Sequence, residues 1–232
     1  MSKHGKRFLL ARQEVKEPAY ELQEAVRLLK RLPQPKFDQT IELHLKLGVD
    51  AKQSDQQLRG AISLPAGVGR KRRVIAFCAP EAVEGAKKAG AVEAGGDDLV
   101  EKITGGWADF DVAVAHPQMM KNVAKLGRIL GPQGKMPTPK AGTVGPDVPA
   151  LVGEFAAGKV EYRNDAGGNI HAAVGKISFT EQAIVDNVLA FLEHIRKRKP
   201  ASAKGQFVQR VVLTATMSPG IPLDLKTLPV GV

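Results

Sequence analysis

The sequence lacks the features that mark secreted and membrane-bound proteins. Cys78 is the only cysteine among 232 residues, so no disulfide can form within the chain, which fits a reducing compartment. No apolar run approaches the length of a membrane span, and the polar stretch 14–18 leaves no core for a signal peptide. We therefore expect a cytoplasmic protein without a membrane partner.

Acidic and aromatic residues are also scarce. The chain has 34 Lys and Arg against 24 Asp and Glu, a net charge of +10 with an isoelectric point near 9.7. Such an excess favours a polyanionic partner, most commonly nucleic acid, although charge alone also fits a basic protein without one. Aromatic residues make up only 5%, which argues against binding an extended single strand by stacking its bases.

Both ends of the chain show the patterns of a sheet with one open face. Residues 40–47 alternate strictly between apolar and polar, which predicts a half-buried strand. Further strands are predicted over 160–163, 170–179 and 207–216, with a hairpin turn at 164–169. Helical periodicity predicts one helix from Pro18 to Pro33 and another over 180–199, and residues 1–17 are expected to form an arm.

The middle of the chain has a different pattern. Residues 74–78 and 112–115 are continuous apolar runs, as in parallel strands that are covered on both faces. Helices are predicted after each run, at 80–88 and 118–126, and this alternation indicates a doubly wound α/β unit.

These two patterns predict a discontinuous outer domain, residues 1–66 and 160–232, that carries an inserted α/β domain, residues 67–159. Covered and open sheets rarely share one layer, and Gly- and Pro-rich joints lie near 65–67 and 158–159. The outer segments together hold +7 of the +10 charge, so a polyanion is expected to bind there first.

The sequence holds no convincing enzymatic motif. Gly67-Val68-Gly69 lacks the third glycine of a dinucleotide fingerprint, and Met136 follows Lys135 where a phosphate loop needs Ser or Thr. The histidines show no metal-ligand spacing, so we expect no metal and no cofactor. One alternative stays open, an α/β enzyme or small-molecule-binding protein with a pocket near Cys78 and His116 and an incidental basic surface.

Two basic runs and one loop remain as candidate features. The runs Arg70–Arg73 and Arg196–Lys199 could contact phosphates or be solvated, and neither is specific. Residues 126–137 hold three glycines and two prolines, which predicts a long, shaped loop with Arg128, Lys135 and Lys140 beside it.

Several segments, in order along nearly the whole chain, resemble the bacterial large-subunit ribosomal protein L-one family. They are KFDQTIEL at 36–43, LGRILGPQGKMP at 126–137, YRND at 162–165 with Ile170-His171, and TATMSP at 214–219. The resemblance implies a non-enzymatic protein with an α/β fold of two domains: a split, open-faced α/β sandwich and an inserted, Rossmann-like domain of three α/β/α layers.

The resemblance also implies partners. The family binds a three-way helical junction of large-subunit ribosomal RNA and forms a mobile stalk that helps exit-site transfer RNA to leave. It represses translation by binding a similar fold in its own operon messenger RNA, and the free protein is expected to be a monomer. The expected location is the large ribosomal subunit in the cytoplasm.

Matching positions one by one, the resemblance implies an RNA-binding set made of Lys36, Phe37, Thr40, Glu42, Asp165, His171, Thr216, Met217 and Ser218. Two positions depart from the family pattern, because Ser218 stands where glycine is common and Ala166 stands where lysine is frequent. Other roles stay open for three members: Glu42 could be a surface charge paired with Lys46 or a neighbour, and Phe37 and Met217 could be core residues.

Overall fold

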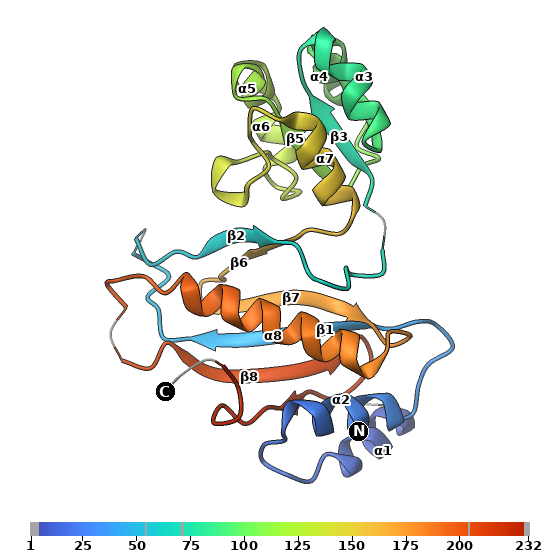
Figure 1. The fold of residues 1–232 in the computed structure, drawn as a ribbon, viewed down its shortest axis with the longest axis vertical. Coiled ribbons are helices and arrows are strands. Elements are labelled where there is room, and N and C mark those ends of the chain that lie inside the picture. Colours follow the sequence, from blue (N-terminus) through green and yellow to red (C-terminus); the bar gives the residue numbers. More distant parts are fainter. Residues whose placement is uncertain (1–4, 54, 71, 204, 230–232) are drawn as a thin grey trace. The chain divides into compact units, whose positions relative to one another are not determined.

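The computed structural model describes residues 5–53, 55–70, 72–203 and 205–229, and its chain divides into two compact units (Figure 1). The outer unit combines Met1–Gly69 with Val160–Val232, and the inserted unit is Arg70–Lys159. The first boundary lies three residues beyond the expected one. The reason is packing, because Val68 belongs to the core of the outer unit. The Asn187 side chain also holds this segment: its Oδ1 accepts from the Ala66 N–H and its Nδ2 donates to the Gly67 carbonyl, both at 2.9 Å.

The outer unit is built on an antiparallel sheet with the strand order β7-β1-β8-β9. The strands are β1 (Thr40–Leu47), β7 (Asn169–Lys176), β8 (Val208–Ala215) and β9 (Ile221–Pro222). In β1 the apolar side chains of every second residue are buried and the polar ones between them are half-exposed, as the alternation predicted.

Two helices cover one face of this sheet, α2 (Leu22–Arg31) and α8 (Glu181–Lys197). Their apolar stripes share a single core with the buried side of β1, and the opposite side of the sheet carries the polar residues. Helix α8 begins where expected because the Thr180 hydroxyl caps it, accepting from the Ala183 N–H at 3.3 Å.

Two parts of the outer unit differ from the sequence-based expectations. The expected N-terminal arm contains helix α1 (Lys6–Glu14), which buries Ala11 in the core, while residues 1–4 lie outside the described residues. A separate two-stranded sheet pairs β2 (Arg59–Ile62), which was not predicted, with β6 (Val160–Arg163), which was.

The inserted unit has a parallel three-stranded sheet in the order β4-β3-β5. Its strands are β3 (Val74–Phe77), β4 (Ala91–Gly95) and β5 (Val112–Ala115), and both β3 and β5 are fully buried. Helices α3 (Pro80–Lys88) and α7 (Val148–Ala156) pack together beside this sheet. A second core joins α4 (Asp97–Thr104) to Ile75 and Phe77. The predicted fold class, a split open-faced unit with a three-layer α/β/α insert, is confirmed.

The region predicted as one helix and a long loop is a run of short helices. They are η1 (Pro117–Met119), α5 (Met120–Val123), η2 (Ala124–Leu126) and α6 (Gly127–Leu130), followed after a turn by η3 (Pro139–Ala141). The loop prediction was therefore wrong over 127–130, because Leu126 and Leu130 are buried in the core and hold α6 in place.

None of the described helices is both long enough and apolar enough to cross a lipid bilayer.

Candidate nucleic-acid interface

Thr40 and Thr216, which are 176 positions apart in sequence, are joined by reciprocal hydrogen bonds. The Thr216 N–H donates to the Thr40 carbonyl and the Thr40 N–H donates to the Thr216 hydroxyl oxygen, each at 3.1 Å. The two segments meet because β1 and β8 are neighbours in the sheet, with Ile41 opposite Ala215. The structure therefore brings together the two segments that the RNA-binding prediction requires. We call the cluster Lys36, Phe37, Thr40, Thr216, Met217 and Ser218 the threonine patch.

A tight turn shapes one side of the threonine patch. The Ser218 N–H donates to the Ala215 carbonyl at 2.9 Å, which closes a β-turn over residues 215–218. The Ser218 hydroxyl folds back and accepts from the Ala215 N–H at 2.8 Å. Ser218 does not need the left-handed conformation that favours glycine, since no described residue other than glycine has a positive φ. The serine therefore fits this turn, and its hydroxyl is used within it.

Phe37 and Met217 are surface residues. The two residues are 52% and 53% exposed, so the alternative of a core position does not hold for either of them. They are two of the five large apolar side chains that are exposed among the described residues, and they lie in segments joined by the Thr40–Thr216 bonds. Exposed apolar side chains beside polar ones are common where a partner binds.

Cations and hydroxyls surround these apolar groups. The Lys176 ammonium donates to the Thr40 hydroxyl at 2.8 Å, and Lys36 is exposed. Asp38 is occupied locally, since its carboxylate accepts from the Ser178 hydroxyl at 2.9 Å and from the Ser178 N–H at 3.2 Å. The Asp38 carboxylate is thus bound within the protein, while the Lys36 ammonium remains at the surface.

Glu42 lies on the open face of β1, beside His44 rather than Lys46. Its carboxylate is 3.7 Å from His44 Nε2, whereas the Lys46 ammonium donates to the Gly167 carbonyl. The alternative role, a surface charge paired with Lys46 or a neighbour, therefore holds for the neighbour His44 and not for Lys46. The Glu42 side chain keeps 41% of its surface exposed and can still accept a hydrogen bond from a partner.

His44 and His171 face each other across β1 and β7. They are directly paired in the register, and their Nδ1 atoms are 2.7 Å apart. One ring must donate and the other accept, so at least one of the two nitrogens carries no proton. Burial, reinforced by His171, lowers the pKa of His44, and the Glu42 carboxylate opposes this effect.

Asp165 and His171 lie toward the end of β1 that is distant from the threonine patch. Thr40 pairs with Lys176 and Lys46 pairs with Asn169, so the two ends of the strand are about 20 Å apart. Asp165 accepts from the N–H groups of Gly167 and Asn169, at 2.8 and 2.7 Å. Hydrogen bonds from Asn169 lower the pKa of Asp165 to about 2. Its first role is therefore to shape the 164–169 turn.

The inserted unit carries a cationic ridge that the sequence analysis only partly identified. The segment from Val112 to Pro146 contains no Asp or Glu. Four exposed cations in it have no acidic partner within 4.0 Å among the described residues; these are Lys121, Lys125, Arg128 and Lys140, which we call the basic ridge. The first three are spaced by four and then three residues, which keeps them on one side of a helical run. That spacing, together with the lack of acidic residues in the segment, is the sequence feature from which the basic ridge could have been predicted.

Several members of the two basic runs have local partners instead. Arg73 pairs with Asp109, and Arg70 lies 3.5 Å from Asp111, while Lys71 is outside the described residues. At the end of α8, Arg196 donates to the Pro229 carbonyl at 3.2 Å and Lys199 to the Gly205 carbonyl at 3.4 Å.

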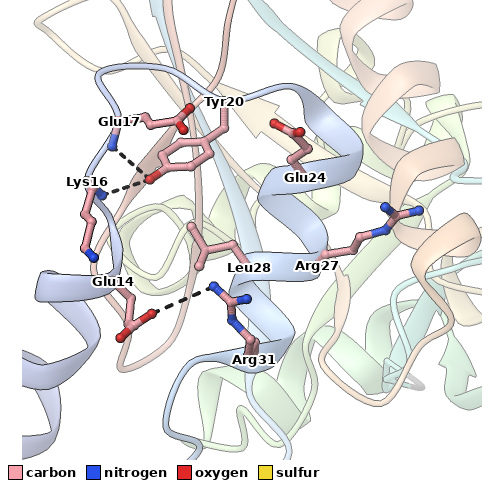
Figure 2. Close-up of a pocket in the computed structure, with 8 residues that line it drawn as sticks. All are labelled: Glu14, Lys16, Glu17, Tyr20, Glu24, Arg27, Leu28 and Arg31. Carbon is pink, nitrogen blue, oxygen red and sulfur yellow. Dashed lines mark hydrogen bonds and ion pairs between the residues drawn. The ribbon is translucent and has the colours of Figure 1, made fainter.

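A groove of about 430 Å³ between α1 and α2 has a different character (Figure 2). The Tyr20 hydroxyl in it accepts from the backbone N–H groups of Lys16 and Glu17, and Glu14 pairs with Arg31 at 3.8 Å. Three carboxylates line it against three cations, so its charges balance, and none of the predicted RNA-binding residues takes part. The groove has no excess of positive charge that would attract a polyanion.

Cys78 and His116 do not form an activated pair. Cys78 is 1% exposed, and burial raises the pKa of its thiol, which disfavours the reactive thiolate. His116 caps the helix that follows it, since its Nδ1 accepts from the Gln118 N–H at 3.3 Å. Among the residues that the structure describes, no three His, Cys, Asp or Glu side chains are arranged to hold a metal ion.

Comparison with known proteins identifies the family. The family model described as "Ribosomal protein L1p/L10e family" matches residues 28–219. The chain belongs to this family. The chain is 52% identical over 225 residues to "Large ribosomal subunit protein uL1" from Kosmotoga olearia, an alignment that covers 97% of both chains.

Two further relatives carry the same name. The Protochlamydia amoebophila protein is 49% identical over 208 residues, covering 90% of this chain and 88% of its own. The Chlamydia caviae protein is 47% identical over 230 residues, covering 98% and 99%. These matches confirm the resemblance, the predicted absence of enzymatic activity and the predicted cytoplasmic location on the ribosome.

Proposed function

We propose that the outer unit anchors the protein to a folded junction of large-subunit ribosomal RNA through the threonine patch. The observation that carries this proposal is the pair of reciprocal bonds between Thr40 and Thr216. These bonds join two sequence-distant segments into one preformed surface. The relatives' printed name, a protein of the large ribosomal subunit, supports the same partner.

The chemistry of the threonine patch suits folded RNA better than an extended strand. The hydroxyls of the patch, with the nearby Glu42 carboxylate, can bond 2′-hydroxyls and base edges. Lys36, and Lys176 beside Thr40, can approach phosphates, and Phe37 and Met217 can pack on riboses or an exposed base. RNA in a junction is recognised mainly through its shape, so a rigid surface is an advantage. The reciprocal bonds between Thr40 and Thr216 supply that rigidity already in the free protein.

The binding assay that tests this proposal is salt dependence on an RNA fragment containing the three-way junction. If six or more phosphates are contacted, affinity should fall by about 10³ or more between roughly 50 and 200 mM salt. Footprinting on the same fragment should show protection at the junction, which Thr216→Val and Met217→Ala weaken. A binding curve that does not depend on salt, or protection that is unchanged in both variants, contradicts the proposal.

The inserted unit is proposed to contact transfer RNA as it leaves the exit site, with the protein forming a mobile stalk. The support is the basic ridge, which has four exposed cations and no acid in its segment. A helical face with this charge attracts the phosphates of a second nucleic acid without reading its sequence.

The same threonine patch is proposed to bind the operon messenger RNA and so to repress translation. Because both RNAs would occupy one surface, they should compete. A labelled ribosomal junction should be displaced by a messenger fragment of similar fold, and Thr216→Val should weaken both complexes in parallel. Simultaneous binding of the two RNAs to one protein would show that separate surfaces are used.

A further inference from the structure

Gln39 is a buried polar residue at the meeting point of the segments that build the threonine patch. It is 2% exposed and directly precedes β1. Its side-chain Oε1 accepts from the Met217 N–H at 3.1 Å, and its backbone carbonyl accepts from the Ile177 N–H at 2.9 Å. Its Nε2 donates to Gln34 Oε1. One side chain thus ties the 215–218 turn to the entry of β1.

The Met217 amide depends on this contact. The 215–218 turn is closed by the Ser218 N–H, and the N–H at the third position of a β-turn takes no part in that closure. Gln39 Oε1 is the acceptor that the structure gives this donor, across 178 positions of sequence. Without it the Met217 N–H would have to turn to water, and the turn would lose its link to β1.

The hydrogen bond to the Met217 N–H fixes the backbone position from which the Met217 side chain projects. Met217 is more than half exposed, and so is Phe37, two positions before Gln39. A flexible methionine loses conformational freedom when a partner immobilises it, and a fixed backbone reduces this loss. The buried glutamine therefore links the Met217 backbone to the segment that carries Phe37.

We propose that Gln39 is a positioning residue for RNA binding: it contacts no RNA itself and holds the Met217 backbone so that Thr216 and Met217 are presented in their binding geometry. This inference rests on the proposed RNA-binding function of the threonine patch. It predicts a role for a side chain that is inaccessible to RNA, which distinguishes it from every member of the expected RNA-binding set.

The chain offers a closely matched control. Gln56 is also buried in the outer unit, its Oε1 also accepts a backbone N–H, from Asp50 at 2.8 Å, and its Nε2 also donates to a second glutamine, Gln53, at 2.7 Å. Gln39→Met and Gln56→Met remove the same kinds of bond and keep similar side-chain volume. They should lower thermal stability to a similar extent, but only one of them touches the threonine patch.

The measurement is the affinity and dissociation rate of the full-length protein on the RNA three-way junction fragment. Gln39→Met should weaken binding about tenfold, mostly through faster dissociation, which is the size expected for loss of one hydrogen bond. The slope of affinity against salt should stay unchanged, since no phosphate contact is removed. Gln56→Met should bind like the wild type, and Gln39→Glu, which keeps an acceptor oxygen for Met217, should recover most of the affinity.

A double-mutant cycle with Met217→Ala separates positioning from a general loss of stability. If Gln39 acts by presenting Thr216 and Met217, the effect of Gln39→Met should be clearly smaller when the Met217 side chain is already removed by alanine. Additive effects, or equal RNA losses in Gln39→Met and Gln56→Met, overturn the proposal. If the wild type binds the junction and Gln39→Met binds it equally well, only the role of Gln39 is rejected. If the wild type does not bind the junction, the proposed function and this inference are both rejected.

Discussion

The Thr216 side chain directly joins the two segments of the threonine patch. Its hydroxyl accepts from the Thr40 N–H at 3.1 Å and lies 3.3 Å from the Thr40 carbonyl, to which it can donate. A valine side chain has nearly the same shape but can neither accept nor donate a hydrogen bond. The Thr40 N–H would then lose its acceptor at the beginning of β1, where water can replace it.

Thr216→Val should therefore reduce affinity for the RNA junction about tenfold and lower the free energy of unfolding by about 1 kcal/mol. Equilibrium binding and urea denaturation measure the two effects. Thr104→Val is a matched control, because its hydroxyl also bonds a backbone carbonyl, Val100 at 2.8 Å, but in the inserted unit. Equal RNA binding by the two variants would show that the Thr216 hydroxyl has no part in recognition.

Phe37 can be tested separately from stability. The residue is 52% exposed, so truncation to alanine removes little buried contact from the folded protein. We expect Phe37→Ala to weaken RNA binding about tenfold, by analogy with other exposed aromatic anchors, and to shift the unfolding midpoint very little. Leu10→Ala, at a leucine that is 56% exposed on α1, should change neither quantity. A large loss of stability in Phe37→Ala would mean that the ring supports the fold instead.

At the scale of elements, strands with a clear period or a continuous apolar run could be predicted closely. Strand β1 occupies the expected residues 40–47 because every second side chain enters the core. Strand β4, Ala91–Gly95, was missed because its alanines and glycine have low strand propensity and its side chains are only half-buried. Helix α1 was missed because its charged sequence has almost no apolar stripe, and it is held by a tertiary contact through Ala11.

The candidate site was predictable only through the family resemblance. Nothing in the local pattern around residue 40 indicates a contact with residue 216, since the pairing depends on the order of strands in the sheet. Gln39 was missed for the same reason: its importance comes from a bond to Met217, which is distant in sequence. Local patterns predict elements, whereas the sheet topology decides which loops meet.

The facing histidines of β1 and β7 predict a dependence of stability on pH. Because burial and His171 lower the pKa of His44, the folded protein holds the neutral form more strongly than the unfolded chain does. Protons then favour the unfolded state, so this contribution is complete above pH 6.5 and is lost as the pH falls below it. Glu42 and Asp165 carry negative charge near the pair, and Lys46 and Arg210 carry positive charge in the same surface pocket.

Urea denaturation at pH 7.5 and at pH 5.5 should show lower stability at the acidic value. His44→Gln should reduce that difference without abolishing it, because burial also lowers the pKa of His194, aided by Arg198 and Lys197. An unchanged pH dependence in His44→Gln would show that the pair does not titrate in this range.

For the whole molecule, the important fact is that each unit has its own core. The apolar cluster of the outer unit shares no residue with that of the inserted unit. The outer unit remains continuous across the insertion because Ile62 in β2 pairs with Val160 in β6. Each unit therefore has the contacts that a separately folding domain needs.

A fusion of residues 1–69 to residues 160–232 through a short flexible linker should consequently fold and keep the RNA junction affinity within about threefold of the full chain. Circular dichroism establishes folding, and the junction assay measures binding. A folded fusion that does not bind would place the primary RNA contact in the inserted unit.

The inserted unit should, in turn, control binding of the second nucleic acid. Replacing Lys121, Lys125 and Arg128 with glutamine removes three charges from the basic ridge and should weaken transfer RNA binding while leaving the junction affinity unchanged. The salt slope for transfer RNA should also become shallower, by up to about 0.9 for each phosphate that the variant no longer neutralises. The control replaces Lys87, Lys88 and Lys102, which removes the same net charge from helices that also carry acids. If both triple variants weaken transfer RNA binding equally, net charge alone explains the effect and the basic ridge is not a defined contact surface.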